Sequence, residues 1–213
     1  MAGTQAAAVA DGQELSPRAQ ALLRSAYRVI ARQGSHRLSL QDVADEGGVS
    51  KGMVLYYFKS KENLFLTTMR YALERTDTRI RERLAAVDAD DPREVVAALI
   101  DAIFIGPEQN RSFYLLYLDL VEHAARVPSF GRLAALAAEI IDRQFQEVIR
   151  AGVARGGFRV EDPEAAAAAT RALIEGTFLT WMQRGDWRAS HARFKALCRA
   201  GLLRLLGAAE PAP

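Results

Sequence analysis

Residues 39–61, SLQDVADEGGVSKGMVLYYFKSK, constrain the fold of this chain more than any other stretch. A serine stands just ahead of an apolar-periodic run twice, at Ser39 and at Ser50, and serine is a preferred N-cap residue. The pattern predicts two short helices joined through Gly47-Gly48. Two such helices cannot bury their apolar sides alone, so a third helix has to cover them.

The preceding segment predicts that third helix. Ser16-Pro17 is a helix start, with serine as the N-cap and proline at the first helical position. Gly34 provides a stop after about Gln33. The expected apolar side consists of Leu22, Leu23, Ala26, Tyr27, Val29 and Ile30. We therefore predict a three-helix domain over residues 16–60, with Val43, Ala44, Val49, Val54, Tyr57 and Phe58 turned inward.

A short helix presented with its N-terminus first fits the major groove of DNA. The net charge of the chain is only +2, but between residues 18 and 61 eight lysines and arginines face three acidic residues. Positive charge is thus concentrated where the motif lies, which favours contact with a nucleic acid. The predicted DNA-binding residues are Ser39, Ser50, Lys51, Gly52, Met53, Leu55, Tyr56, Tyr57 and Lys61.

These residues have different expected roles. Gly52 lets the backbone approach the groove, and Lys51 is suited to a phosphate or a guanine edge. The apolar register assigns Tyr56 to the groove side and Tyr57 mainly to packing, with its hydroxyl near a phosphate. Lys61 begins a helix, where backbone amides already favour an anion, so we expect a phosphate contact there.

Residues 48–52 also satisfy G-x-S-x-G, the pattern of a hydrolase nucleophile elbow. That chemistry needs the serine on a sharp turn between a strand and a helix. The preceding segment is predicted to be helical and no run alternates as a strand would, so we predict that the chain is not an enzyme.

The rest of the chain shows helical periodicity only, and the predicted fold class is all-α, with about nine helices. Beyond Ser60 we expect helices to about Val87, from Asp91-Pro92 to about Ile105, and over residues 109–126, 130–152, 162–183 and 189–206. Residues 61–207 form the predicted helical regulatory and dimerisation domain, and residues 1–15 and 208–213 are predicted to be flexible tails.

Composition narrows the remaining possibilities. Half of the 213 residues are hydrophobic, which excludes general disorder, and no window approaches 18 uninterrupted apolar residues. With no signal-peptide pattern, we expect a cytoplasmic protein without a membrane partner. The single Cys198 forbids a disulfide within the chain; it is a small buried hydrophobe or a redox-sensing thiol. His36, His123 and His191 are widely separated, so we expect no metal site and no cofactor.

Aromatic and polar residues of the larger domain are candidates for a ligand pocket, because a long helical bundle has room for a small molecule between its helices. The same residues fit an ordinary core or internal salt bridges. The candidates are Phe104, Phe113, Tyr114, Tyr117, His123, Phe145, Arg171, Glu175, Phe178 and Trp181. Such an interior suggests a hydrophobic or cationic compound.

The last two predicted helices carry a wide apolar stripe, which favours association of two chains over a monomer core. Small residues on the first of them would let two copies approach closely. The predicted dimer-interface residues are Ala169, Leu173, Gly176, Phe194, Leu197, Cys198, Gly201, Leu202 and Leu205.

Residues 48–64, GVSKGMVLYYFKSKENL, closely resemble the signature of the tetracycline-repressor (TetR) family of bacterial regulators. The resemblance extends back through LSLQDVA and covers roughly residues 16–66. Two positions depart from the pattern. Gly47 stands where alanine is usual, and Leu55 stands where tyrosine is most frequent, which removes a hydroxyl that commonly reaches DNA.

The resemblance implies a homodimer with a four-helix interface from the last two helices, and a small-molecule effector in the larger domain. Effector binding would move the long connecting helix and change the separation of the two DNA-binding heads. We therefore predict a ligand-responsive repressor that binds a pseudo-palindromic operator. The alternative is a structural DNA-bound protein that recruits a partner without a small-molecule effector.

Overall fold

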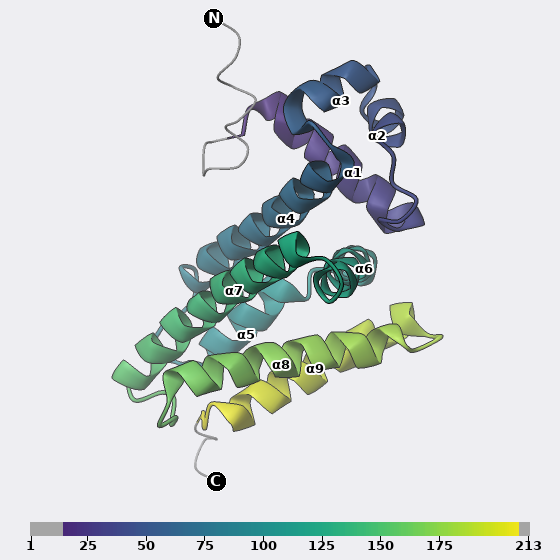
Figure 1. Ribbon diagram of the computed structural model, residues 1–213. Helices are drawn as coiled ribbons and strands as arrows, with labels where there is room; N and C mark the ends of the chain where they lie inside the picture. The colour runs from purple at the N-terminus through teal and green to yellow at the C-terminus, as the bar shows by residue number, and fades with distance from the viewer. Residues whose placement is uncertain (1–14, 209–213) are drawn as a thin grey trace, which may run out of the picture. The chain divides into compact units, whose positions relative to one another are not determined.

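The computed structural model describes residues 15–208, apart from the side chains of residues 129, 130, 132, 133, 136 and 137. The predicted tails 1–15 and 208–213 lie almost entirely outside the described residues. Within them the chain forms nine helices and no strand, so the predicted all-α fold is confirmed (Figure 1). The helices are α1 (Pro17–Gln33), α2 (Leu40–Gly47), α3 (Lys51–Phe58), α4 (Lys61–Leu84), α5 (Pro92–Ile103), α6 (Pro107–Ala124), α7 (Pro128–Ala154), α8 (Pro163–Met182) and α9 (Trp187–Leu205).

Proline opens five of these helices, because its fixed φ suits the first helical position and its missing N–H has no partner there to lose. Side chains cap three of them: Ser16 accepts a hydrogen bond from the Ala19 amide, and Asp91 and Asp162 do the same at α5 and α8. The predicted starts at Ser16-Pro17, Asp91-Pro92 and Asp162-Pro163 are confirmed.

The prediction placed Pro128 at the end of one helix, whereas in the structure it begins α7. Proline cannot continue a preceding helix but fits the first turn of a new one. The same reason moves the start of α6 back to Pro107. The predicted α4 ended at Val87 and is three residues too long, because the helix ends at Leu84.

Contacts divide the chain into two compact units. Among the described residues, unit 1 comprises 15–73 and 112–134, and unit 2 comprises 74–111 and 135–208. The helices α4, α6 and α7 each contribute residues to both units. The sequence predicted a domain boundary between residues 60 and 61, at the end of the helix-turn-helix motif. The compact units differ from this division, because unit 1 also contains the C-terminal part of α6 together with α1, α2 and α3.

The core of unit 1 closes under the three helices that the sequence predicts. The inward residues Leu23, Ala26, Val29, Val43, Ala44, Val54 and Phe58 are all fully buried. Val49 and Tyr57, which were also predicted to turn inward, are half-buried. Because Val54 and Phe58 are one helical turn apart, they hold one side of α3 inside and leave its other side to solvent.

The core of unit 2 is built around the pairing of α8 with α9. The ring of Phe104 stacks on that of Phe178 with centroids 4.3 Å apart, and Trp181 packs edge-on against Phe178. A Cβ added at Gly201 of α9 would lie 3.0 Å from a methyl group of Leu173 on α8. The small residue thus permits a close approach of two helices of the same chain.

None of the helices within residues 15–208 has the length and apolar character that crossing a membrane requires.

A second close contact lies where α7 ends. The Gly152 carbonyl accepts hydrogen bonds from the amides of Gly157 and Phe158, and a methyl group on Gly152 would overlap the buried Phe158 ring. We expect Gly152→Ala to lower the free energy of unfolding by about 1–3 kcal/mol, because the added methyl group would force the buried Phe158 ring or the backbone to shift. Chemical denaturation measures the change. Gly185→Ala is the matched control, since nothing lies within 4 Å of the added carbon; equal effects of the two substitutions would contradict the prediction.

Candidate nucleic-acid interface

The turn between α2 and α3 is fixed by hydrogen bonds that the local sequence provides. Ser39 and Asp42 form a capping box: the Asp42 amide donates to Ser39 Oγ at 3.1 Å, and the Ser39 amide donates to Asp42 Oδ2 at 3.0 Å. Hydrogen bonds from the Ser39 hydroxyl and amide lower the pKa of Asp42. The Ser39 hydroxyl therefore caps α2.

Gly48 ends α2 in the left-handed conformation, with φ 63° and ψ 37°, and its amide donates to Ala44 and Asp45. Glycine adopts this conformation without the steric cost that a Cβ adds. A Cβ at Gly47 would lie 3.2 Å from Leu22 of α1. Glycine in place of the family's usual alanine therefore lets α2 end close against α1.

Helix α3 presents two of its rows to solvent. Lys51 and Leu55 are one helical turn apart, as are Gly52 and Tyr56, and all four are exposed. Leu55 is 37% exposed and Tyr56 is 46% exposed. On the opposite side of the helix, Val54 and Phe58 are each 0% exposed. The burial of one side thus leaves an outward surface that runs from the N-terminus of α3.

The other predicted contact residues of α3 flank this surface. Met53 and Tyr57, again one turn apart, are half-buried, and Ser50 caps the helix by accepting the Met53 amide at 3.3 Å. The Tyr57 ring meets the Tyr56 ring edge-on, with centroids 5.2 Å apart. The assignment of Tyr56 to the outer side and Tyr57 mainly to packing agrees with this geometry. Ser50, the serine of G-x-S-x-G, lies between two helices and not at a strand end.

Lys59 follows α3 in an unusual conformation, with φ 63° and ψ −41°. Its amide donates to the Leu55 carbonyl, and its Nζ lies 5.5 Å from the centroid of the Tyr56 ring. The ammonium group is thereby held next to the exposed surface of α3. Sequence reasoning counted Lys59 as basic charge but did not place it among the contact residues.

Lys61 begins α4, as predicted, and its Nζ donates to the backbone carbonyl of His36 at 3.1 Å. The cation therefore lies beside a helix N-terminus and the loop between α1 and α2. Ser60 caps the same helix by accepting the Asn63 amide at 3.1 Å.

The positive charge of the motif is partly neutralised. Arg28 and Arg32 both contact Glu46, at 2.7 Å and 3.0 Å, and hydrogen bonds from Arg28 and then Arg32 lower the pKa of that carboxyl group. Lys51 is exposed and has no ion-pair partner within residues 15–208. A count of basic residues in the sequence could not distinguish the paired arginines from the exposed Lys51, because the ion pairs form between two different helices, α1 and α2.

Comparison with known proteins agrees with this geometry. Residues 22–68 match the family model described as bacterial regulatory proteins, tetR family, and residues 92–207 match that of the BetI-type transcriptional repressor, C-terminal. The chain belongs to the TetR family of transcriptional regulators. A TetR-family regulator is a DNA-binding protein and not an enzyme, so the predicted family and class are confirmed.

Two curated relatives share the name HTH-type transcriptional regulator BetI. The one from Yersinia pestis is 26% identical over 169 residues, which cover 79% of this chain and 83% of the relative. The one from Vibrio campbellii is 29% identical over 145 residues, covering 62% of this chain and 73% of the relative.

Solved structures show the same fold. A putative transcriptional regulator from Saccharomonospora viridis in complex with choline superposes with a TM-score of 0.75 at 24% identity, covering 89% of this chain and 97% of that one. A putative TetR-family regulator from Rhodococcus sp. gives a TM-score of 0.76 at 23% identity, covering 90% and 100%.

The predicted ligand-pocket residues of this TetR-family regulator do not form one open site within the described residues. Phe104, Phe178 and Trp181 pack against one another in unit 2 and are at most 4% exposed. Of the two possibilities that the sequence left open, a cavity lining or an ordinary core, their close ring packing agrees with the core. Phe145 is likewise buried, in an apolar cluster with Val95.

The polar candidates of unit 2 are paired with other residues of the chain. Arg171 donates two hydrogen bonds to Asp142, at 2.7 Å and 3.2 Å, and lies 3.7 Å from Glu175. The internal salt bridge that the sequence left open is therefore what the structure contains.

In unit 1 the rings of Phe113, Tyr114 and Tyr117 form their own cluster, and His123 stacks on His36 with centroids 5.1 Å apart. His36 and His123 are thus neighbours in the structure although they are distant in the sequence.

The predicted dimer residues fall into two groups. Phe194, Cys198 and Leu202 are buried in the core of unit 2, so assigning them to an intermolecular surface is wrong: they face the chain's own helices. Gly201 likewise serves the packing of α9 on α8. Leu197 is 61% exposed, Gly176 has open space around it, and Ala169, Leu173 and Leu205 are half-buried. The apolar residues of α9 therefore lie on two sides of the helix, one buried in unit 2 and one exposed to solvent.

Cys198 is fully buried, and this burial raises the pKa of its thiol to about 11, while a hydrogen bond with Thr177 opposes the shift. A thiol of this kind stays protonated and inaccessible at neutral pH, so the structure favours the buried-hydrophobe interpretation over a redox sensor.

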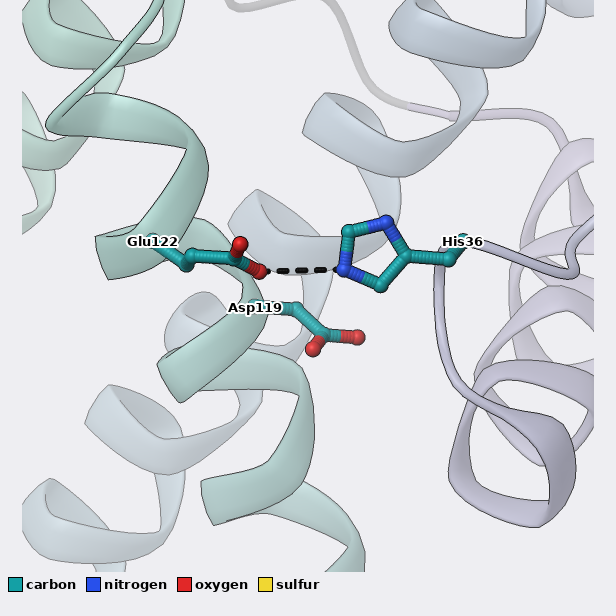
Figure 2. Close-up of side chains that lie close together, drawn as sticks. All are labelled: His36, Asp119 and Glu122. Carbon is teal, nitrogen blue, oxygen red and sulfur yellow. Dashed lines mark hydrogen bonds and ion pairs between the residues drawn. The ribbon is translucent and has the colours of Figure 1, made fainter.

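Two histidine contacts escaped sequence reasoning. His191 Nε2 lies 2.9 Å from Asn110 Oδ1 in the core of unit 2, and burial lowers the pKa of this imidazole. His36, in the loop between α1 and α2, approaches the carboxyl groups of Asp119 and Glu122 on α6 (Figure 2). No local pattern signals either contact, because more than eighty residues separate the partners.

Proposed function

We propose that the chain is a homodimeric, ligand-responsive repressor that binds a pseudo-palindromic operator. The observation that carries this proposal is the outward surface of α3, defined by Lys51, Gly52, Leu55 and Tyr56. These four residues are exposed from the first turn of a helix whose opposite side is fully buried. A rigid helix with an exposed N-terminal end is the geometry with which helix-turn-helix proteins enter the major groove.

The chemistry of this surface suits both the backbone and the bases of DNA. Lys51 reaches a phosphate or a guanine edge, and the absent side chain of Gly52 permits close approach. The Tyr56 hydroxyl can hydrogen-bond a phosphate or a base edge. Leu55 offers an apolar contact suited to the methyl group of thymine, where most family members offer a hydroxyl.

Dimerisation is supported by an exposed apolar face on α8 and α9. Ala172, Gly176 and Leu179 recur at one helical turn along α8 and are exposed, Leu179 by 47%. On α9, Leu197 is 61% exposed, the highest value among the large hydrophobic side chains that the structure describes. Exposed apolar residues on two paired helices suit an association surface, and two copies related by a twofold axis would bury them on both chains.

The effector is proposed to be a small organic cation of the choline type. The Saccharomonospora viridis regulator of the same fold was solved with choline. Aromatic faces recognise quaternary ammonium groups, and Phe104, Phe178 and Trp181 supply such faces in unit 2. Because these rings are packed together, entry of a cation would have to separate them, which couples binding to a conformational change.

The DNA-binding role of Lys61 is tested by the salt dependence of operator affinity. We expect Lys61→Ala to weaken binding to all sequences and to reduce the slope of log K against log salt by about one unit, because one phosphate contact is lost. Fluorescence anisotropy at several salt concentrations measures both quantities. Lys195→Ala is the control, since Lys195 pairs with Asp101 in unit 2. A slope equal to that of the unchanged protein would show that Lys61 does not contact phosphate.

The dimer is tested by placing a charge on the exposed face. We expect the unchanged protein to have twice the 23.4 kDa chain mass in light scattering, and Leu197→Glu to shift it towards the monomer. A buried unpaired carboxylate is costly at an interface, whereas an exposed one is not. Ile105→Glu, at a residue 43% exposed outside α8 and α9, should leave the mass unchanged. A monomeric unchanged protein would refute the proposed assembly.

The effector is tested with choline at millimolar concentration. We expect the melting temperature to rise and the operator affinity to fall, since a ligand stabilises the state that binds it. Differential scanning fluorimetry and anisotropy measure the two effects. Sodium ion at equal ionic strength is the control. If choline changes neither quantity, the effector belongs to another chemical class; if no small molecule does, the alternative of a DNA-bound protein without an effector is favoured.

A further inference from the structure

Three potential metal ligands meet in unit 1 although they are distant in the sequence (Figure 2). His36 comes from the loop between α1 and α2, and Asp119 and Glu122 come from one face of α6, three residues apart. One ligand atom from each residue lies within 4.8 Å of the other two. His36 Nε2 is 3.0 Å from Glu122 Oε2. We call these three residues the His36 cluster.

The His36 cluster is held in place by contacts around it. The backbone amide of Ser35 donates to Asp119 Oδ2 at 2.8 Å, which fixes that carboxylate beside the loop. The imidazole of His123 stacks on that of His36, and Lys61 holds the carbonyl of His36. Arg126 contacts Glu122 Oε1 at 2.9 Å and leaves Oε2 directed to the cluster. The loop and α6 thus present the three groups in a defined arrangement.

A buried hydroxyl next to the His36 cluster has no hydrogen-bond partner. Ser35 is only 4% exposed, and its Oγ contacts no donor or acceptor within the described residues. This is the residue whose amide binds Asp119. A buried polar atom without a partner is unfavourable, and a water molecule bound to a cation nearby is one way to satisfy it.

The ligand types indicate which cation fits. One imidazole and two carboxylates are three protein ligands, which leaves a fourth tetrahedral position for water, as in open zinc sites. Magnesium and calcium prefer oxygen ligands alone, whereas an imidazole nitrogen favours zinc and its neighbours in the first transition row. The side chain of His36 is 62% exposed and that of Glu122 is 39% exposed, so a cation can reach them from solvent.

We propose that the His36 cluster is a binding site for a divalent transition-metal cation of the Zn²⁺ type. When occupied, the site ties the loop after α1 to α6, in addition to the hydrogen bonds already present. This inference is independent of the proposed effector and operator, because it concerns a different set of residues and a measurement without DNA.

Zinc binding to tag-free, full-length protein tests the proposal. After removal of metals with a chelator, Zn²⁺ is titrated in competition with a chromophoric chelator. We expect one Zn²⁺ per chain, and at least about tenfold weaker binding in each of His36→Asn, Asp119→Asn and Glu122→Gln, because each removes one ligand. Glu164→Gln is the matched control: Glu164 is an exposed carboxylate paired with Arg150 at 2.8 Å, as Glu122 is with Arg126.

Two further measurements make the outcome independent of folding defects. Circular dichroism verifies that each variant is folded, and Co²⁺ absorbance reports the ligand set directly. Amide hydrogen exchange of residues 34–38 should slow with Zn²⁺ in the unchanged protein and not in Glu122→Gln. Zinc affinity that is undiminished in folded His36→Asn, or the absence of saturable binding in the unchanged protein, would overturn the proposal. Equal binding of Mg²⁺ would overturn the assigned cation class.

Discussion

The burial of Val54 and Phe58 in the core of unit 1 is the interaction on which the outward surface of α3 depends. Helix α3 has eight residues, and a helix of that length is not stable alone in water. Its shape therefore comes from packing its inner side and from the Ser50 cap. Since the outer residues of α3 are positioned only through this packing, the geometry of the outward surface depends on all three helices, α1, α2 and α3.

The parts of the fold that could be predicted from the sequence are those determined by neighbouring residues. A capping serine or aspartate followed by proline fixes a helix start through the backbone conformation of three or four residues. The starts of α1, α5 and α8 follow from this. The outward direction of Tyr56 and the inward direction of Val54 follow from helical periodicity alone. Pro128 shows the limit, because proline marks a boundary without stating on which side of it the helix lies.

The parts that could not be predicted depend on which distant elements meet. Periodicity showed an apolar stripe on α9 but not what covers it, so Cys198 and Leu202 were assigned to a partner although α8 and α5 already cover them. Likewise, the sequence left open whether Arg171 contacts a ligand or forms an internal salt bridge, and only the fold identifies Asp142 on α7 as its partner. The approach of His36 to Asp119 depends on how α6 packs on the head, which no local pattern encodes.

Lys59 joins α3 to α4 in a region of backbone space that glycine occupies readily and lysine rarely does. Its Cβ costs on the order of 1 kcal/mol there. This conformation places the Lys59 ammonium group beside the Tyr56 ring, near the C-terminal end of α3. Lys51 lies at the N-terminal end of the same helix. The exposed side of α3 therefore has a cationic side chain near each of its ends, Lys51 at the first and Lys59 at the last.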